Sequence, residues 1–216
     1  MRMKKISALF LLFSLLLSTL LSCTNNVRPP ETDEELLRIA EALCEESKAV
    51  NSLCFGDGIL PKENGYKIGA YVEADKESLS LYGIERVSDI EAKIKSVYTY
   101  STYIWIRDTV LSSDKSESDA TVLSYARYYD GERETDGTKS HVLMVRTSYE
   151  QRAFGEILYS NYRMEKTEGK DSFRFLVTVT VKDGEKETVY PDESILVYRE
   201  SGVWLLDTPT YATVGK

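Results

Sequence analysis

The sequence predicts an α+β domain in which a long N-terminal helix and several short helices pack on a curved antiparallel β-meander. Apolar residues recur at helical spacing through residues 32–54, and alternation replaces this period in the second half of the chain. Asp183-Gly184 lies between two alternating segments and is typical of a hairpin turn. Helices that precede an antiparallel meander are typical of the α+β class.

A secretory signal precedes this domain. Arg2, Lys4 and Lys5 form a cationic start, and residues 6–21 are apolar apart from Ser and Thr. A helix of about 16 residues extends roughly 24 Å, which is shorter than a hydrocarbon core of about 30 Å. The segment therefore has the layout of a signal peptide rather than a spanning helix.

The end of this segment, Leu20-Leu21-Ser22-Cys23, resembles a bacterial lipobox. The resemblance implies cleavage before Cys23, a diacylglycerol on its thiol and often a third acyl chain, such as palmitate, on its amine. Two or three acyl chains anchor a protein stably, whereas one does not. The alternatives are an ordinary signal peptide with a chance cysteine, or an uncleaved anchor.

These features divide the chain into three parts. We expect residues 1–22 to be the signal peptide, residues 23–31 to be the lipidated cysteine and a polar tether, and residues 32–216 to be one domain. The expected location is the cell membrane, on the extracytoplasmic face of a bacterium.

The charge of the mature chain limits its partners. Arg2, Lys4 and Lys5 leave with the signal, which reduces 27 basic residues to 24 against 35 acidic ones, a net charge near −11. Nucleic acid and anionic lipid surfaces require clustered Lys and Arg, so neither is expected as the main partner. The 15 Tyr residues suit an exposed β-sheet, and they also suit a platform for sugars or peptides.

The helical part begins with a capping box, Thr32 and Glu35, and is expected to stop at Gly56 and Gly58. Cys44 and Cys54 would lie about 15 Å apart along this helix, too far for a disulfide, so we expect two free thiols. Three short helices are expected to follow. The first covers residues 77–82, the second begins at a capping box of Ser88 and Glu91, and the third runs from a cap at Ser101 to residue 111.

Strands are expected at residues 66–73, 121–129, 142–146 and 157–166, with residues 112–119 and 130–140 as polar loops. Residues 173–181 form the clearest strand, since Phe and Val alternate with Arg and Thr. The return strand runs to about residue 198 with a bulge or edge position at Pro191, and residues 203–206 close the sheet.

This order of elements resembles a cystatin-like or nuclear-transport-factor-2-like cone, with Gly202-Val203-Trp204 and residues 207–211 at its end. More narrowly, residues 87–111 and 155–204 are similar in layout to the secreted inhibitors of cell-wall DL-endopeptidases. That resemblance implies an acidic domain that occupies the substrate groove of a wall-cutting enzyme. It assigns no inhibitory residue.

The sequence offers few candidates for catalysis or metal binding. His141 could act as a base near Asp136, but a lone loop histidine is usually solvated. The carboxylates of Asp114, Glu117 and Asp119 do not have the spacing of an EF-hand loop. Cys44 and Cys54 lie on an apolar helix, which does not favour a nucleophile. We therefore expect no catalytic residue, no cofactor and no metal.

The best candidates for partner or ligand contact form the densest aromatic cluster, Tyr98, Tyr100, Tyr103 and Trp105, of which some must be core. We expect a lipid-anchored binding protein without enzymatic activity, whose partner is a cell-wall hydrolase or a wall component. The most specific form of this hypothesis is a regulator or inhibitor of cell-wall hydrolases. The alternative is a domain that uses a pocket inside its cone to bind or transform a small molecule.

Overall fold

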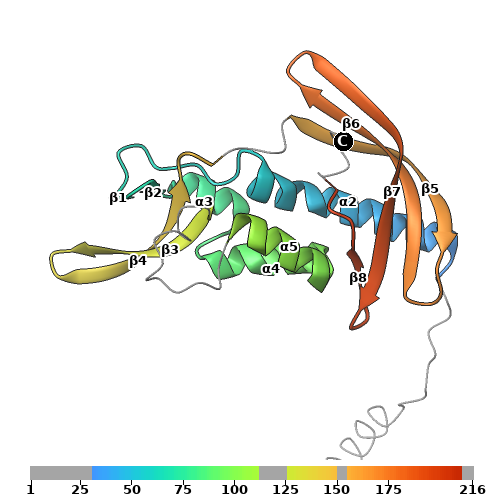
Figure 1. The fold of residues 1–216 in the computed structure, drawn as a ribbon, viewed down its shortest axis with the longest axis horizontal. Helices are drawn as coiled ribbons and strands as arrows, with labels where there is room; N and C mark the ends of the chain where they lie inside the picture. The colour runs from blue at the N-terminus through green and yellow to red at the C-terminus, as the bar shows by residue number, and fades with distance from the viewer. Residues whose placement is uncertain (1–30, 112–125, 150–154, 211–216) are drawn as a thin grey trace, which may run out of the picture. The chain divides into compact units, whose positions relative to one another are not determined.

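The computed structural model describes residues 31–111, 126–149 and 155–210. Contacts divide the chain into Met1–Glu31 and a compact unit, Thr32–Lys216, to which the following description applies. This unit combines helices with two antiparallel four-stranded sheets and confirms the α+β class (Figure 1). Among the described residues, no helix is both long and apolar enough to cross a bilayer.

Helix α2 spans Asp33–Phe55. The predicted capping box is present: the Glu35 N–H donates to Thr32 Oγ1 over 3.2 Å, and the Thr32 N–H donates to Glu35 Oε2 over 2.8 Å. Its buried face follows helical spacing and includes Leu36, Ala40, Leu43, Cys44, Ser47 and Val50. Gly56 ends the helix, since its N–H donates to the carbonyl groups of Asn51 and Ser52.

The first sheet is a meander of β5 (Glu156–Thr167), β6 (Ser172–Asp183), β7 (Lys186–Glu200) and β8 (Val203–Leu206), which curls over α2 (Figure 1). Alternate β6 residues, from Phe173 to Val179, are fully buried and face the helix. The Asp183-Gly184 turn is confirmed. The predicted irregularity at Pro191 is also confirmed, because the β6–β7 register shifts between Val177 and Val179, opposite Pro191 and Asp192.

The second sheet was not predicted. Its order is β1 (Lys67–Ile68), β2 (Tyr71–Glu73), β4 (Thr138–Arg146) and β3 (Tyr128–Thr135). The expected loop at 130–140 is wrong, because those residues form most of a hairpin that turns at Asp136 and Gly137 with φ of 52° and 75°. The segment lacks the apolar alternation that indicates a strand, because most of its side chains are exposed on both faces of the hairpin and neither face requires apolar residues. Part of the strand expected at 121–129 lies outside the described residues.

Three short helices lie in the chain between β2 and β3: α3 (Lys76–Tyr82), α4 (Val87–Val97) and α5 (Tyr100–Val110). Gly83 ends α3 in the left-handed conformation. The expected Ser88–Glu91 box is wrong, because α4 starts earlier and the Asp89 carboxylate accepts from the N–H groups of Glu85 and Arg86. Thr99, rather than Ser101, provides the side-chain cap of α5.

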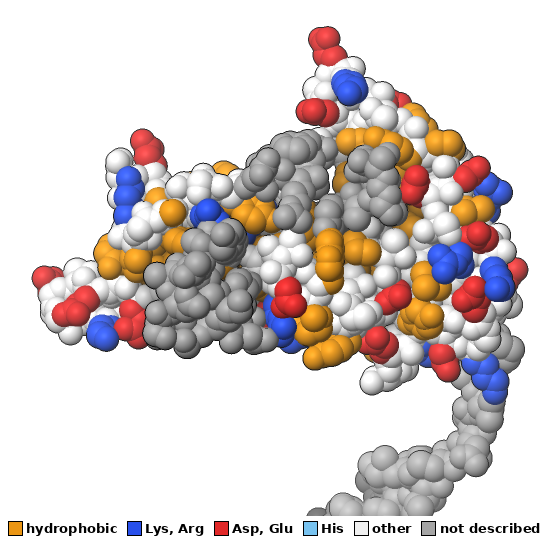
Figure 2. All heavy atoms as spheres, viewed as in Figure 1, with side chains coloured by type: hydrophobic (Ala, Val, Ile, Leu, Met, Phe, Trp, Pro, Cys, Tyr) orange, Lys and Arg blue, Asp and Glu red, His pale blue; other side chains and the backbone are white. Residues whose placement is uncertain are grey.

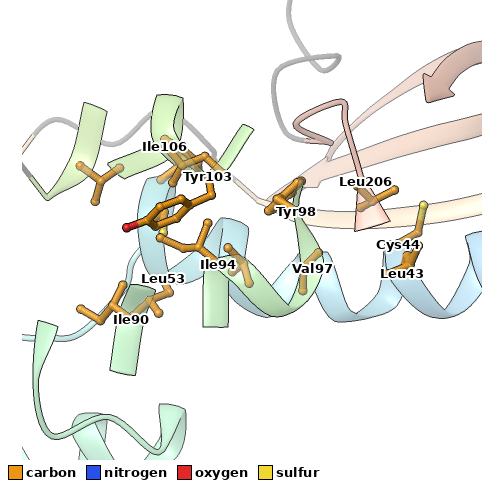
Figure 3. Packing of buried hydrophobic residues seen from close by; sticks show 14 of the residues in the cluster. Leu43, Cys44, Leu53, Ile90, Ile94, Val97, Tyr98, Tyr103, Ile106 and Leu206 are labelled. Carbon is orange, nitrogen blue, oxygen red and sulfur yellow. The ribbon is translucent and has the colours of Figure 1, made fainter. Parts of the chain in front are cut away.

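The core lies where α2 meets α4, α5 and the inner face of the β5–β8 sheet. Figure 3 shows Leu53 of α2 near Ile90 and Ile94 of α4, and Tyr98 between the helices and the sheet. The side chains of α2, such as Ala40 and Cys44 with no exposed surface, pack against the concave face of the sheet. They occupy the region in which the alternative hypothesis places a ligand pocket.

Candidate functional site

The structure separates the four aromatic residues predicted to contact a partner. Tyr98 and Tyr103 are buried, at 1% and 4% exposure, whereas Tyr100 and Trp105 are 66% and 42% exposed. The Tyr98 hydroxyl donates to Asn51 Oδ1 over 2.9 Å, and the Lys95 ammonium lies 4.3 Å from the centre of the Tyr103 ring. The four residues differ in burial because the helix is broken between α4 and α5. Tyr98 is the C-cap of α4, so one continuous helical spacing does not relate it to the three residues of α5.

Tyr100 belongs to an exposed apolar group that the sequence did not predict. Glu200 pairs with Val203 across the β7–β8 turn, and Tyr198 lies two residues before Glu200 on the same face of the sheet. The Glu200 carboxylate accepts from the Tyr100 N–H over 3.1 Å, which brings the start of α5 to this face. We call Tyr100, Tyr198, Glu200 and Val203 the α5–β8 surface.

The side chains of this surface are accessible: Tyr198 is 38% and Val203 56% exposed. Figure 2 shows that, on the face viewed, exposed hydrophobic side chains form separate groups among acidic and basic ones. Tyrosine is enriched among the residues that dominate protein–protein binding energies, because it combines a large apolar ring with a hydroxyl group. The α5–β8 surface can therefore act as a contact surface around one carboxylate.

His141 lies on β4 rather than in a loop, and its partner is not Asp136. Its Nε2 atom is 3.0 Å from Asp130 Oδ1 on the neighbouring strand. The same oxygen of Asp130 accepts from the Val87 N–H at the start of α4 over 3.0 Å. This pair joins the hairpin to a helix, which gives it a structural role.

Cys44 and Cys54 are buried, and both are free thiols, as predicted. Burial raises the pKa of Cys44 and that of Cys54 to about 12. A nucleophilic cysteine requires a stabilised thiolate near the surface, and neither side chain meets this requirement.

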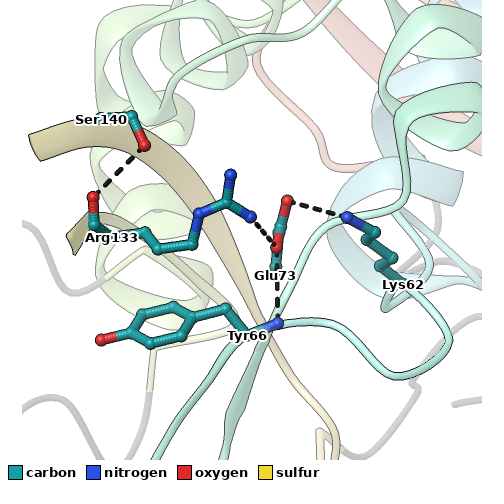
Figure 4. Close-up of polar contacts among 5 residues, drawn as sticks. All are labelled: Lys62, Tyr66, Glu73, Arg133 and Ser140. Atoms are coloured by element: carbon teal, nitrogen blue, oxygen red, sulfur yellow. Dashed lines mark hydrogen bonds and ion pairs between the residues drawn. The ribbon is translucent and has the colours of Figure 1, made fainter. Parts of the chain in front are cut away.

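The carboxylate of Glu73 is largely buried and has several polar contacts. It accepts from the Tyr66 N–H over 3.4 Å and lies 3.3 Å from Lys62 Nζ and 3.0 Å from Arg133 Nη1 (Figure 4). Burial alone would raise the pKa of Glu73, but the Tyr66 N–H and the two cations outweigh it and lower that pKa. These contacts tie β2, β3 and the preceding loop together, and Ser140 Oγ donates to the Arg133 carbonyl within the same hairpin.

A groove of about 740 Å³ lies between α3 and the start of α4. Its lining combines apolar, cationic and acidic side chains: Lys76, Leu79, Ser80, Gly83, Ile84, Glu85 and Asp89. The volume is within the range of small-molecule sites, roughly 300–1,000 Å³. This groove was not predictable from the sequence, which indicates only short helices in this region.

The remaining predicted sites lie outside the described residues. These are the lipidation site Cys23 and the carboxylates of Asp114, Glu117 and Asp119. Within the described ranges, no group of three or more His, Cys, Asp or Glu side chains could hold a metal ion.

Compared with known proteins, the chain matches no protein-family model and no curated protein sequence.

Proposed function

We propose that the chain is a binding protein, anchored by lipid on Cys23 to the extracytoplasmic face of a bacterial membrane. Its partner contact is the α5–β8 surface. The observation that carries this proposal is the grouping of three exposed hydrophobic side chains, Tyr100, Tyr198 and Val203, around Glu200 on an acidic domain. Burial of such side chains against a partner is favourable by roughly 25 cal/mol per Å².

The side chains that could act in catalysis are engaged in structural contacts or buried, which favours binding over catalysis. His141 is paired with Asp130, Glu73 is held by Lys62 and Arg133, and the cysteine thiols are buried. Each of these groups has a structural role or is inaccessible.

The proposed anchor and tether suit a membrane-proximal partner. Eight residues, 24–31, separate Cys23 from the first residue of the folded unit. Such a segment extends to about 29 Å at most, so the domain would act close to the membrane.

We propose a cell-wall hydrolase, specifically a DL-endopeptidase, as the partner. The layout of the chain resembles secreted inhibitors of these enzymes. The negative charge near −11 of the mature chain also favours a partner with a basic groove.

The test is direct binding between the full chain and a purified peptidoglycan DL-endopeptidase. The double variant Tyr100→Ala/Val203→Ser should weaken binding by about tenfold or more, because truncation at a hot spot costs at least about 1–2 kcal/mol. Leu81→Ser is the matched control, since Leu81 is 80% exposed on α3. Equal weakening by the control would refute the assignment of the surface, and no binding by the wild-type chain would refute the partner.

A further inference from the structure

The groove between α3 and α4 has a separation of charge along its length. Lys76, Leu79 and Ser80 are spaced at i, i+3 and i+4, so they form one face of α3, and the C-cap residue Gly83 follows them in the groove lining. Lys76 is at the start of this face, and Glu85 and Asp89 contribute at the opposite end, beyond Gly83. Seven residues of helix separate the two ends by about 10 Å.

The floor of the groove between these charges is apolar. Ile84 is 2% exposed, and Leu79 is partly buried and packs against the core cluster. Gly83 contributes no side chain, and a Cβ at this position would meet no atom within 4 Å, so the groove is open there. An aliphatic side chain of a ligand could lie against Leu79 and Ile84.

At each end of the groove one charged side chain, Lys76 or Glu85, is available. Among the described residues, neither Lys76 nor Glu85 forms an ion pair through its side chain. Asp89 Oδ2 accepts from the N–H groups of Glu85 and Arg86, each over 2.9 Å, which fixes the carboxylate in place. These bonds lower the pKa of Asp89, so it stays ionised at neutral pH.

From this arrangement we propose that the groove binds a short peptide with free termini and an apolar side chain. The ammonium group of the peptide lies at Glu85 and Asp89, its carboxylate lies at Lys76, and its side chain lies against Leu79 and Ile84. A tripeptide fits the groove, because three extended residues span about 10 Å. This site is separate from the α5–β8 surface and does not depend on the proposed partner.

Titration of the full chain with Ala-Leu-Ala, followed by amide chemical shifts, tests the proposal. We expect shifts at residues 76–89 that saturate, and about tenfold weaker binding when the peptide is N-acetylated or when Glu85→Gln is introduced. Lys76→Gln and the C-terminally amidated peptide should weaken binding in the same way. Glu77→Gln, on α3 outside the groove lining, is the control and should leave the affinity unchanged.

Two results would overturn the proposal. One is the absence of shifts at residues 76–89 at millimolar peptide. The other is equal affinity for the free, acetylated and amidated peptides, which would show that the charged ends of the groove do not recognise the termini.

Discussion

The Nη2 atom of Arg127 lies 2.7 Å from the carbonyl oxygen of Gly56, the C-cap residue of α2. The same nitrogen donates to the carbonyl of Asp57 over 2.6 Å, and the Tyr128 hydroxyl donates to the carbonyl of Leu53 over 2.8 Å. The last turn of α2 contains no basic residue. A residue from a distant part of the chain thus supplies the positive charge and the hydrogen bonds that helix C-termini require.

Replacement of Arg127 by Met should lower the free energy of unfolding by about 2–4 kcal/mol. The buried Gly56 carbonyl would lose its charged donor, and the stacking of the guanidinium on Tyr149, 4.6 Å from the ring centre, would be lost. Urea unfolding measures the change. Arg163→Met is the control, because Arg163 is exposed and its ion pair with Asp192 should contribute less than about 1 kcal/mol. Equal losses for both variants would contradict this role for Arg127.

Thr210 links the end of the described chain to the core. Its hydroxyl is 2.6 Å from Asn51 Nδ2, 2.9 Å from Ser47 Oγ and 3.1 Å from the Tyr98 hydroxyl. Thr210→Val keeps the shape but leaves buried polar groups with fewer partners, which should cost about 1–3 kcal/mol. Thr180→Val, on the partly exposed face of β6, should change stability by less than about 0.5 kcal/mol. Thermal unfolding of both variants provides the comparison, and a neutral Thr210→Val would disprove the role.

The contribution of Glu73 to stability should depend on pH. Because the folded state lowers its pKa, the carboxylate stabilises the fold above the ordinary glutamate pKa of about 4.3 and loses this contribution as the pH falls through the lower folded value. Glu73→Gln should therefore destabilise the chain at pH 7 and have a smaller effect near pH 3. Urea midpoints at both pH values test this against Glu132→Gln, whose exposed side chain pairs with Lys139. A pH-independent loss for Glu73→Gln would be inconsistent with an ionised, paired carboxylate.

Thiol reactivity tests the burial of the cysteines and the proposed lipidation together. The chain has three cysteines, of which Cys44 and Cys54 are buried with pKa values raised to about 12. Neither should react with a thiol reagent at pH 8 in the folded chain. In urea, chain purified from the producing membrane should show two reactive thiols. Three would mean that Cys23 is not acylated, and a reactive Cys44 or Cys54 in the native state would contradict their burial.

Local signals in the sequence predicted much of the fold. The Thr32–Glu35 box marks the start of α2, and the alternation in β6 identifies both the strand and its buried face. The division of the strands into two sheets was not predictable in this way, because strand partners depend on contacts between distant segments. Within the β3–β4 hairpin, the expectation of a loop at residues 130–140 is wrong because the sequence of this segment does not distinguish a buried face from an exposed one.

The candidate sites were less predictable than the fold. Sequence alone identified Tyr100 as an aromatic residue of interest, but the break between α4 and α5 decides that Tyr98 is buried and Tyr100 exposed. Tyr198 and Val203 join Tyr100 only because β7 and β8 pair in one register. The separation of charge in the α3–α4 groove depends on how the two helices pack together. The role of Arg127 depends on its contact with the end of α2, which is distant in sequence.

The most direct test of the proposed function is the rate at which a DL-endopeptidase digests peptidoglycan in the presence of the full chain. We predict that the wild-type chain inhibits digestion in proportion to its concentration, and that Tyr100→Ala/Val203→Ser inhibits about tenfold less well than Leu81→Ser. An unchanged digestion rate at a molar excess of the wild-type chain would contradict the proposal that the chain regulates these hydrolases.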